Sequence, residues 1–325
     1  MLSLFRTNQS FASLLLFGYA LLLQAPVLVF GVPEADFEGG TYFDTLIREL
    51  VAGNWWLTVL LPPVMLAVAG MVANSICDRY RFARTTTQFP GLVLVLLWAV
   101  VPSFHAFDPT DLCHAFLLLA MGSLGSTYKS HSPDVARFNA GWWLGLAALL
   151  EPVYLVFVPA FVVGISIFRT ANLRTITQLL VGVCVAFFLG GTVAYLDGAG
   201  AAFVTGQLAG FGFANFAALH WLDLIGFGIL ALGLLVALSS GSPSRALLSI
   251  EGAKNNAFVY WVLLFTPLVA LLDSVVDAGS AQVVLPPLGI LLGLWLARRT
   301  EARAEFFHLL VFAAALTLTA VALHR

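Results

Sequence analysis

The chain consists of long apolar runs separated by short polar connections. A bilayer core of about 30 Å requires roughly 20 apolar residues in a helix, because unpaired backbone groups are costly in hydrocarbon. Apolar and polar residues do not alternate within the runs, as they would in barrel strands. The pattern predicts an all-α polytopic integral membrane protein with about 11 transmembrane helices (10–12), near residues 10–31, 56–77, 88–104, 111–127, 138–150, 152–168, 175–196, 221–239, 256–273, 280–297 and 305–323.

The segment 138–168 allows two interpretations, one long helix or two short ones. The first short run spans only about 20 Å and does not cross a bilayer unaided. However, Arg137 and Arg169 both fit the same side of the membrane, which requires an even number of crossings between them. We therefore expect two short helices that turn at Glu151-Pro152, with Glu151 below the outer membrane surface.

The charged residues of the loops predict an orientation. Cytoplasmic loops are rich in Lys and Arg, and an N-terminus inside places every basic residue except Arg48 and Arg325 in a cytoplasmic loop. Most acids fall on the opposite side, the exceptions being Asp78, Asp134, Glu251, Glu301 and Glu305. We expect the N-terminus in the cytoplasm and the C-terminus outside.

Composition excludes several classes of protein. The 325 residues are 60% hydrophobic and 10% charged, with a net charge of −2, and the mean hydropathy is +0.96. A soluble domain of this size does not bury so much apolar surface, and no basic surface exists for nucleic acid. The three cysteines show no spacing typical of a disulfide framework or a zinc site. We treat residues 1–325 as a single transmembrane domain.

Two outer loops stand out. Residues 32–55 begin with an acidic run and continue into an amphipathic helix on the outer interface. Its apolar positions, at helical spacing, are Phe43, Leu46, Ile47, Leu50 and Val51. Residues 197–220 are rich in Gly, Ala and Phe, which predicts a flexible or re-entrant loop.

Acidic residues of the first outer loop are candidate catalytic groups. A carboxylate such as Asp36 or Glu38 can act as a general base or bind a divalent metal ion. The alternative is a solvated acidic face, in which Asp44 and Arg48 form an ordinary helix ion pair. Arg48 is also the candidate phosphate ligand, since it is the only outer cation apart from the terminal Arg325.

The second outer loop places acids and histidines three residues apart, in SFHAFDPTDLCHAF. Asp108 and Asp111 are candidate metal ligands, and His105 is a candidate substrate-binding residue. The alternative is a normal helix start with Asp108 as N-cap. Glu151 is a further catalytic candidate, because an ionisable group below the membrane surface is costly unless it is paired or lines a wet cavity.

The segment AGWWLGLAALLEPVYLVFVPAFVVGISIFR, residues 140–169, resembles the small-residue hairpin of type C membrane glycosyltransferases. An acidic first outer loop followed by a Tyr-containing helix (DFEGGTYFD) is also similar. The resemblance implies polyprenyl-phosphate-linked sugar substrates, a catalytic base at Asp36 or Glu38 rather than Asp44, and metal ligands at Asp108 and Asp111. The chain departs from that family at Glu151, which precedes Pro where a base is usual.

The segments SLFRTNQSFASLLLF and IFRTANLRTITQLLVG resemble a bacterial family of polytopic membrane proteins with no established function. This resemblance implies the bacterial inner membrane and brings no catalytic residues. Together, the patterns favour an outer-facing site that binds a lipid-linked glycan, with Asp36, Glu38 or Glu151 as base and Arg48, Asp44 and His105 on the substrate. The alternatives are a non-catalytic subunit or scaffold of an envelope assembly, and a transporter.

Overall fold

The computed structural model describes residues 2–6, 10–32, 40–83, 86–128, 131–213, 219–239, 249–274 and 278–324. This part of the chain is all helical, which confirms the predicted fold class. Its α-helices are α1 (Ser10–Leu23), α2 (Ala25–Phe30), α3 (Tyr42–Val51), α4 (Trp55–Arg79), α5 (Phe89–Trp98), α6 (Thr110–Gly125), α7 (Pro133–Leu150), α8 (Val158–Phe168), α9 (Leu173–Leu196), α10 (Gly200–Ala209), α11 (Trp221–Ser239), α12 (Ile250–Leu271), α13 (Leu285–Ala297) and α14 (Glu301–Leu323). Short 3₁₀ segments include η1 (Leu2–Arg6), η2 (Pro102–His105), η3 (Ser126–Tyr128), η4 (Pro152–Phe157) and η6 (Gly279–Val284).

Six helices of the described chain are long and apolar enough to cross a membrane, which supports the predicted membrane class. They are α4, α9, α11, α12, the joined segment Gly279–Ala297 and α14. Other apolar runs form shorter helices. The run predicted at 88–104 contains the 10-residue α5, about 15 Å long at the α-helical rise. Val101 is extended before Pro102, so the helix does not continue.

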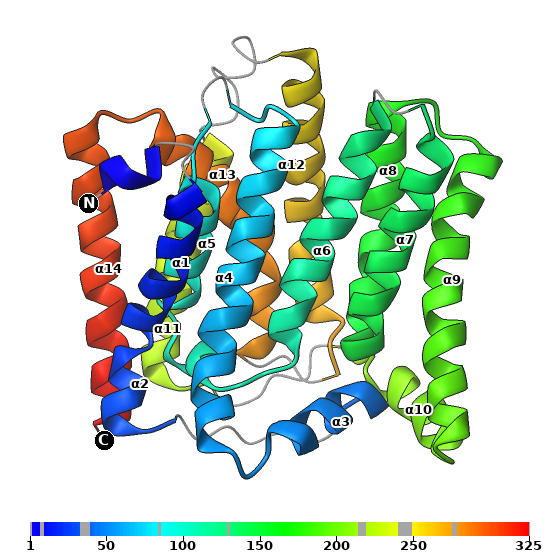
Figure 1. The fold of residues 1–325 in the computed structure, drawn as a ribbon, viewed down its shortest axis with the longest axis horizontal. Coiled ribbons are helices and arrows are strands. Elements are labelled where there is room, and N and C mark those ends of the chain that lie inside the picture. The colour runs from blue at the N-terminus through cyan, green and yellow to red at the C-terminus, as the bar shows by residue number, and fades with distance from the viewer. Residues whose placement is uncertain are drawn as a thin grey trace.

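Successive long helices run in opposite directions, so their ends gather at two ends of the bundle (Figure 1). We call one the basic end; it carries the N-terminus, and there the Arg6 guanidinium donates to the Arg299 carbonyl at 2.9 Å. We call the other the acidic end. There α3 and α10 lie across the bundle (Figure 1), and the Tyr42 hydroxyl donates to Asp197 at 2.8 Å. Basic and acidic side chains thus separate in space as they do along the sequence.

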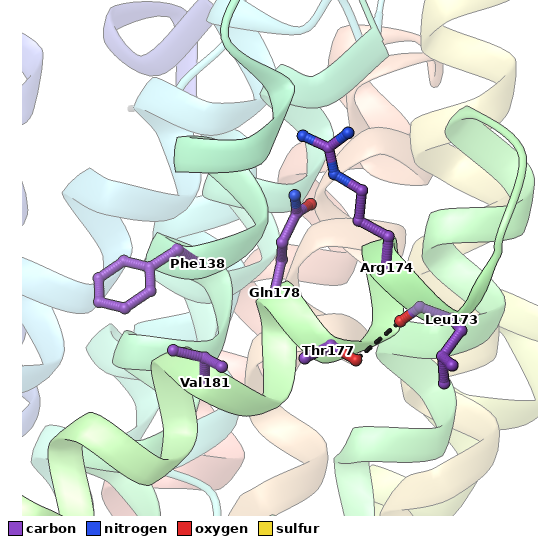
Figure 2. Close-up of a pocket in the computed structure, with 6 residues that line it drawn as sticks. All are labelled: Phe138, Leu173, Arg174, Thr177, Gln178 and Val181. Atoms are coloured by element: carbon purple, nitrogen blue, oxygen red, sulfur yellow. Dashed lines mark hydrogen bonds between the residues drawn. The ribbon is translucent and has the colours of Figure 1, made fainter.

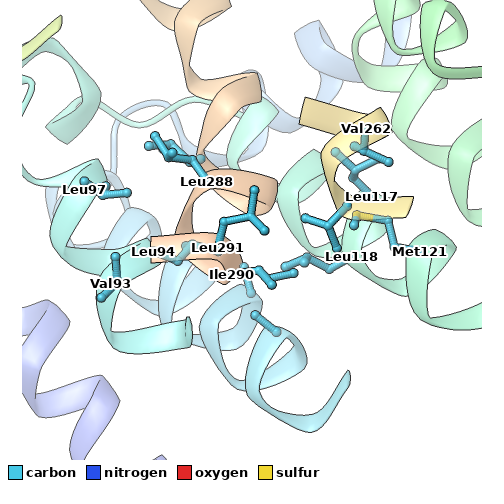
Figure 3. Close-up of a cluster of buried hydrophobic side chains, with 14 of the residues drawn as sticks. Val93, Leu94, Leu97, Leu117, Leu118, Met121, Val262, Leu288, Ile290 and Leu291 are labelled. Carbon is cyan, nitrogen blue, oxygen red and sulfur yellow. The ribbon is translucent and has the colours of Figure 1, made fainter. Parts of the chain in front are cut away.

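Helices α5 and α13 form the centre of the bundle. Every residue of α5 is buried, and so is nearly every residue of α13. Figure 3 shows Leu94 and Leu97 near Leu288 and Leu291, with Leu117 of α6 in the same cluster. A helix surrounded by other helices is apolar on all sides, which accounts for the uniform hydrophobicity of both runs.

The predicted helical hairpin at 138–168 is confirmed. Helix α7 ends at Leu150, Glu151 is extended, and η4 leads directly into α8. The first helix is longer than expected, because it already begins at Pro133 and has 18 residues.

The amphipathic helix of the first outer loop is also confirmed, as α3. The Gly/Ala/Phe-rich segment 197–220 differs from its prediction. It contains the regular helix α10, in place of a loop alone. Phe203 explains the difference, because its side chain is buried in a small cluster with Leu149 and Ala194 and packs edge-on against Phe43. Tertiary burial outweighs the weak helix propensity of glycine here.

Candidate functional site

The acidic end is organised around the C-terminus of α7. Glu151 precedes Pro152 and is extended, so α7 stops at Leu150. The last carbonyl groups of a helix have no partner within the helix, and in a membrane protein they must find one elsewhere. Side chains of neighbouring helices therefore hydrogen-bond the carbonyl groups at the end of α7.

Two other helices supply those partners, and a third bonds the carbonyl of Ala147, which already accepts from the Glu151 N–H at 2.9 Å. The Thr41 hydroxyl, which also caps α3, is shared between the carbonyls of Leu149 and Leu150 at 2.9 and 3.0 Å. The Gln207 amide of α10 donates to Leu149 at 2.9 Å. The Cys113 thiol of α6 donates to Ala147 at 3.5 Å. These contacts anchor α3, α6 and α10 beside the Glu151 turn.

Arg48 joins the two outer loops. Its Nε lies 3.0 and 2.9 Å from the carboxylate oxygens of Asp44, one helical turn earlier, which confirms the predicted ion pair. Its Nη2 lies 3.1 Å from Oδ1 of Asp108, at the start of α6. The three side chains are only 23%, 11% and 14% exposed. The pairing is thus partly shielded from water and stronger than a surface ion pair.

Asp108 also takes part in the start of α6, although Pro109, and not Asp108 as expected, occupies the N-cap position. Its Oδ1 accepts from the backbone N–H of Thr110 at 2.9 Å and from the Thr110 hydroxyl at 2.6 Å. The carboxylate therefore hydrogen-bonds the first turn of α6 and binds Arg48 at the same time.

The same region of the acidic end holds four carboxyl groups. Cys113 lies within electrostatic range of Asp44, Asp108, Asp111 and Glu151, and Tyr154 of η4 lies within range of the last three. We call Asp44, Arg48, Asp108, Asp111 and Glu151 the carboxylate cluster. The structure thus brings together five of the side chains that the sequence singled out.

Asp111 is the most unusual member of the cluster. It is fully buried, and neither carboxyl oxygen has a hydrogen-bond partner among the described residues. The Tyr154 hydroxyl is likewise buried and unpartnered there. Neither Tyr154 nor Cys113 was predicted to contribute, because both belong to apolar runs and only the fold brings them to the acids.

The pKa of Asp44 reflects the burial of its carboxyl group more than its pairing with Arg48. Desolvation raises the pKa of Asp44 above its ordinary value, whereas the hydrogen bonds and charge of Arg48 lower it and Asp108 raises it slightly further. Because the effect of burial on the pKa outweighs that of the ion pair, ionising the Asp44 carboxyl group costs more free energy here than in water. Such shifts are typical of functional clusters, though structural networks also produce them.

The remaining predicted residues lie elsewhere. Asp36 and Glu38 fall outside the described residues. Within the described chain, no group of three His, Cys, Asp or Glu side chains is arranged to hold a metal ion. Asp108 and Asp111 therefore lack a third ligand in this part of the chain, and a metal at this position stays a prediction.

His105 belongs to a separate buried network. Its Nδ1 contacts the Gln24 side chain, and its Nε2 lies 3.1 Å from the Thr319 hydroxyl. The ring packs on Trp98 with centroids 4.5 Å apart. Burial lowers the pKa of His105 to about 4, although a hydrogen bond with the Ala99 backbone opposes this. His105 thus joins helices near both ends of the chain and contacts no member of the carboxylate cluster in the described hydrogen bonds.

Comparisons with protein-family models, curated proteins and solved structures found no match to this chain.

Proposed function

We propose that the chain is a bacterial inner-membrane protein that binds a lipid-linked sugar at its acidic end and transfers the sugar to an acceptor hydroxyl. The observation that carries the proposal is the Arg48 bridge between Asp44 and Asp108, two acids that share with Glu151 an electrostatic influence on Cys113. Three segments far apart in sequence supply one partly shielded cation with several carboxyl groups around it. This is the donor and base set that a phosphate-linked sugar requires.

The proposed chemistry divides the work among these groups. A carboxylate, Asp36, Glu38 or Glu151, takes the proton of the acceptor hydroxyl as its oxygen bonds to the sugar C1. The bond from C1 to the phosphate oxygen breaks, and polyprenyl phosphate leaves with the electron pair. Arg48, held by Asp44 and Asp108, steadies the leaving phosphate. A divalent metal at Asp108 and Asp111 would serve the same purpose if the first outer loop supplied further ligands.

The test is release of polyprenyl phosphate from a labelled polyprenyl-phosphate-sugar donor by the purified full chain. We expect turnover to fall on the order of 100-fold or more in the variant that removes the base, among Asp36→Asn, Glu38→Gln and Glu151→Gln. Arg48→Lys should lower turnover while keeping the charge. Asp134→Asn is the matched control, because Asp134 pairs with Arg137 and Arg174 at the basic end.

Unchanged turnover in all three carboxyl variants would contradict the enzymatic proposal. Donor binding without turnover would instead favour the non-catalytic subunit. In that case, replacing any one of the three acids should leave donor binding unchanged.

The proposal includes an orientation with about 11 crossings, the basic end in the cytoplasm and the acidic end outside. Helix α9 allows a direct test, because the exposed Arg174 and Asp197 lie at its two ends. In a Cys184→Ser background, a membrane-impermeant thiol reagent added to spheroplasts should label Asp197→Cys and not Arg174→Cys. The opposite result would reverse the orientation and place the carboxylate cluster in the cytoplasm.

A further inference from the structure

Three arginines lie on or beside the turn between α13 and α14 at the basic end, Arg298, Arg299 and Arg303, and the N-terminal Arg6 reaches the same turn. Arg6 is fixed by its hydrogen bond to the Arg299 carbonyl and by its position over the Phe89 ring, 5.5 Å from the centroid. The Arg299 guanidinium lies over Trp295 at 4.5 Å. Stacking on an aromatic ring holds a guanidinium flat and leaves its edge available for an anion.

A pocket of about 510 Å³ opens beside these arginines. We call it the basic-aromatic pocket; it is lined by Trp295, Arg299, Ala302, Arg303, Phe306 and Phe307. Phe306 and Phe307 are 63% and 40% exposed. The lining is thus mostly apolar and includes two arginines, and the two phenylalanines open it to the surroundings of the helix.

The apolar wall continues along α14. Leu309 and Leu310 are more than half exposed on the next turn, and α14 is one of the helices suited to cross a membrane. Its uncovered side chains therefore face lipid. Aromatic residues and arginines at the end of such a helix lie at headgroup level.

The local charge is positive. The acids Glu301 and Glu305 lie on the first turns of α14, but neither lines the pocket. The four arginines outnumber them. The pocket therefore complements an anion whose attached chain is apolar.

We propose that the basic-aromatic pocket binds the phosphodiester headgroup of an anionic phospholipid. Arg299 and Arg303 hydrogen-bond the phosphate, and the acyl chains lie over Phe306 and the exposed leucines of α14. Arginine forms paired hydrogen bonds with phosphate oxygens, which a merely cationic surface does not provide. The proposal is independent of any chemistry at the acidic end.

A second cavity at the same end differs in a way that supplies the control. It holds about 470 Å³ and is lined by Phe138, Leu173, Arg174, Thr177, Gln178 and Val181 (Figure 2). Its single arginine already pairs with Asp134 at 3.2 Å. Arg79, also at the basic end, stacks over Tyr80 at 5.7 Å in a groove whose described lining residues include no second cation.

The experiment measures lipid retention by the detergent-purified full chain in native mass spectrometry, after incubation with equal amounts of phosphatidylglycerol and phosphatidylcholine. The wild type should retain phosphatidylglycerol preferentially. In the Arg299→Gln/Arg303→Gln variant this preference should fall roughly 30-fold, since each of the two arginines near an anionic headgroup contributes about 1 kcal/mol. Arg79→Gln/Arg174→Gln removes the same charge from the same end and should lose less than about threefold.

Equal losses in the two double variants would overturn the proposal, because they would reflect net charge alone. Displacement of phosphatidylglycerol by millimolar inorganic phosphate would also overturn it, since the site would then bind a free anion. If the double variant does not fold, the same measurement is made on the single variant Arg303→Gln. Unchanged retention of phosphatidylglycerol in this variant contradicts the assigned role of Arg303.

Discussion

Arg48 Nη2 lies 3.1 Å from Asp108 Oδ1, although the two residues are 60 positions apart in sequence. The contact joins α3 to the first turn of α6 at the acidic end of the bundle. Because Asp44 occupies the Nε side of the same guanidinium, one cation pairs with two carboxylates. Several expected outcomes depend on this arrangement and on the contacts around it.

Arg48→Met should destabilise the protein by about 2–3 kcal/mol, because two partly buried carboxylates lose their common partner. Unfolding in detergent by denaturant measures the change. Arg174→Met is the matched control; its bridge to Asp134 is exposed at 79% and 50% and should contribute less than about 1 kcal/mol. Adding Asp108→Asn to Arg48→Met should recover part of the loss. No recovery would mean that the two side chains are not coupled.

Thr41→Val should loosen α3 from the bundle. The change removes the N-cap of α3 and the hydroxyl that bonds the Leu149 and Leu150 carbonyls, at a cost of about 1–3 kcal/mol. Hydrogen exchange over α3 should rise accordingly. Thr45→Val is the comparison, because its hydroxyl bonds only the Thr41 carbonyl of its own helix. Similar exchange in both variants would show that Thr41 does not anchor α3.

Glycines hold α7 against α9. A methyl group on Gly141 would lie 1.9 Å from the Leu179 carbonyl oxygen, and one on Gly182 would lie 2.2 Å from that of Phe138. Small residues allow such close backbone approach within membranes. Gly141→Ala and Gly182→Ala should each destabilise the protein by roughly 1–3 kcal/mol. At Gly228 an added methyl group meets no atom of the described residues within 4 Å, so Gly228→Ala should be neutral; an equal loss there would point to a general effect of replacing glycine.

His105 should make stability depend on pH. The turn that carries it lies outside the membrane-spanning helices, and its pKa falls from 6.5 to about 4 on folding. The fold therefore requires the neutral imidazole ring of His105. The contribution of this ring to the free energy of unfolding is fully present above about pH 6.5 and is lost as the pH falls toward 4. The loss reaches about 3 kcal/mol at most. His105→Gln should flatten this part of the pH profile, and a slope equal to that of the wild type would contradict the assignment.

The residues behind the glycosyltransferase resemblance have a packing role in this fold. Gly141 and Gly145 face Gly182 and Ala186, so the small residues of the hairpin permit close contact between α7 and α9. Asp223, at the start of α11, likewise has a structural role, because its carboxylate accepts from the Ser103 N–H and hydroxyl of η2 at 3.1 and 2.6 Å.

The sequence alone determined where most of the long helices lie, because apolar runs, prolines and caps act within a few residues of one another. It predicted α3, the hairpin at Glu151-Pro152 and the Asp44–Arg48 pair for this reason. Only the tertiary structure decided that Asp108 shares Arg48, that α10 is a helix, and that His105 belongs to a network with Gln24 and Thr319. These contacts join residues far apart in the chain, and their partners follow from helix packing, which no local pattern of hydrophobicity encodes.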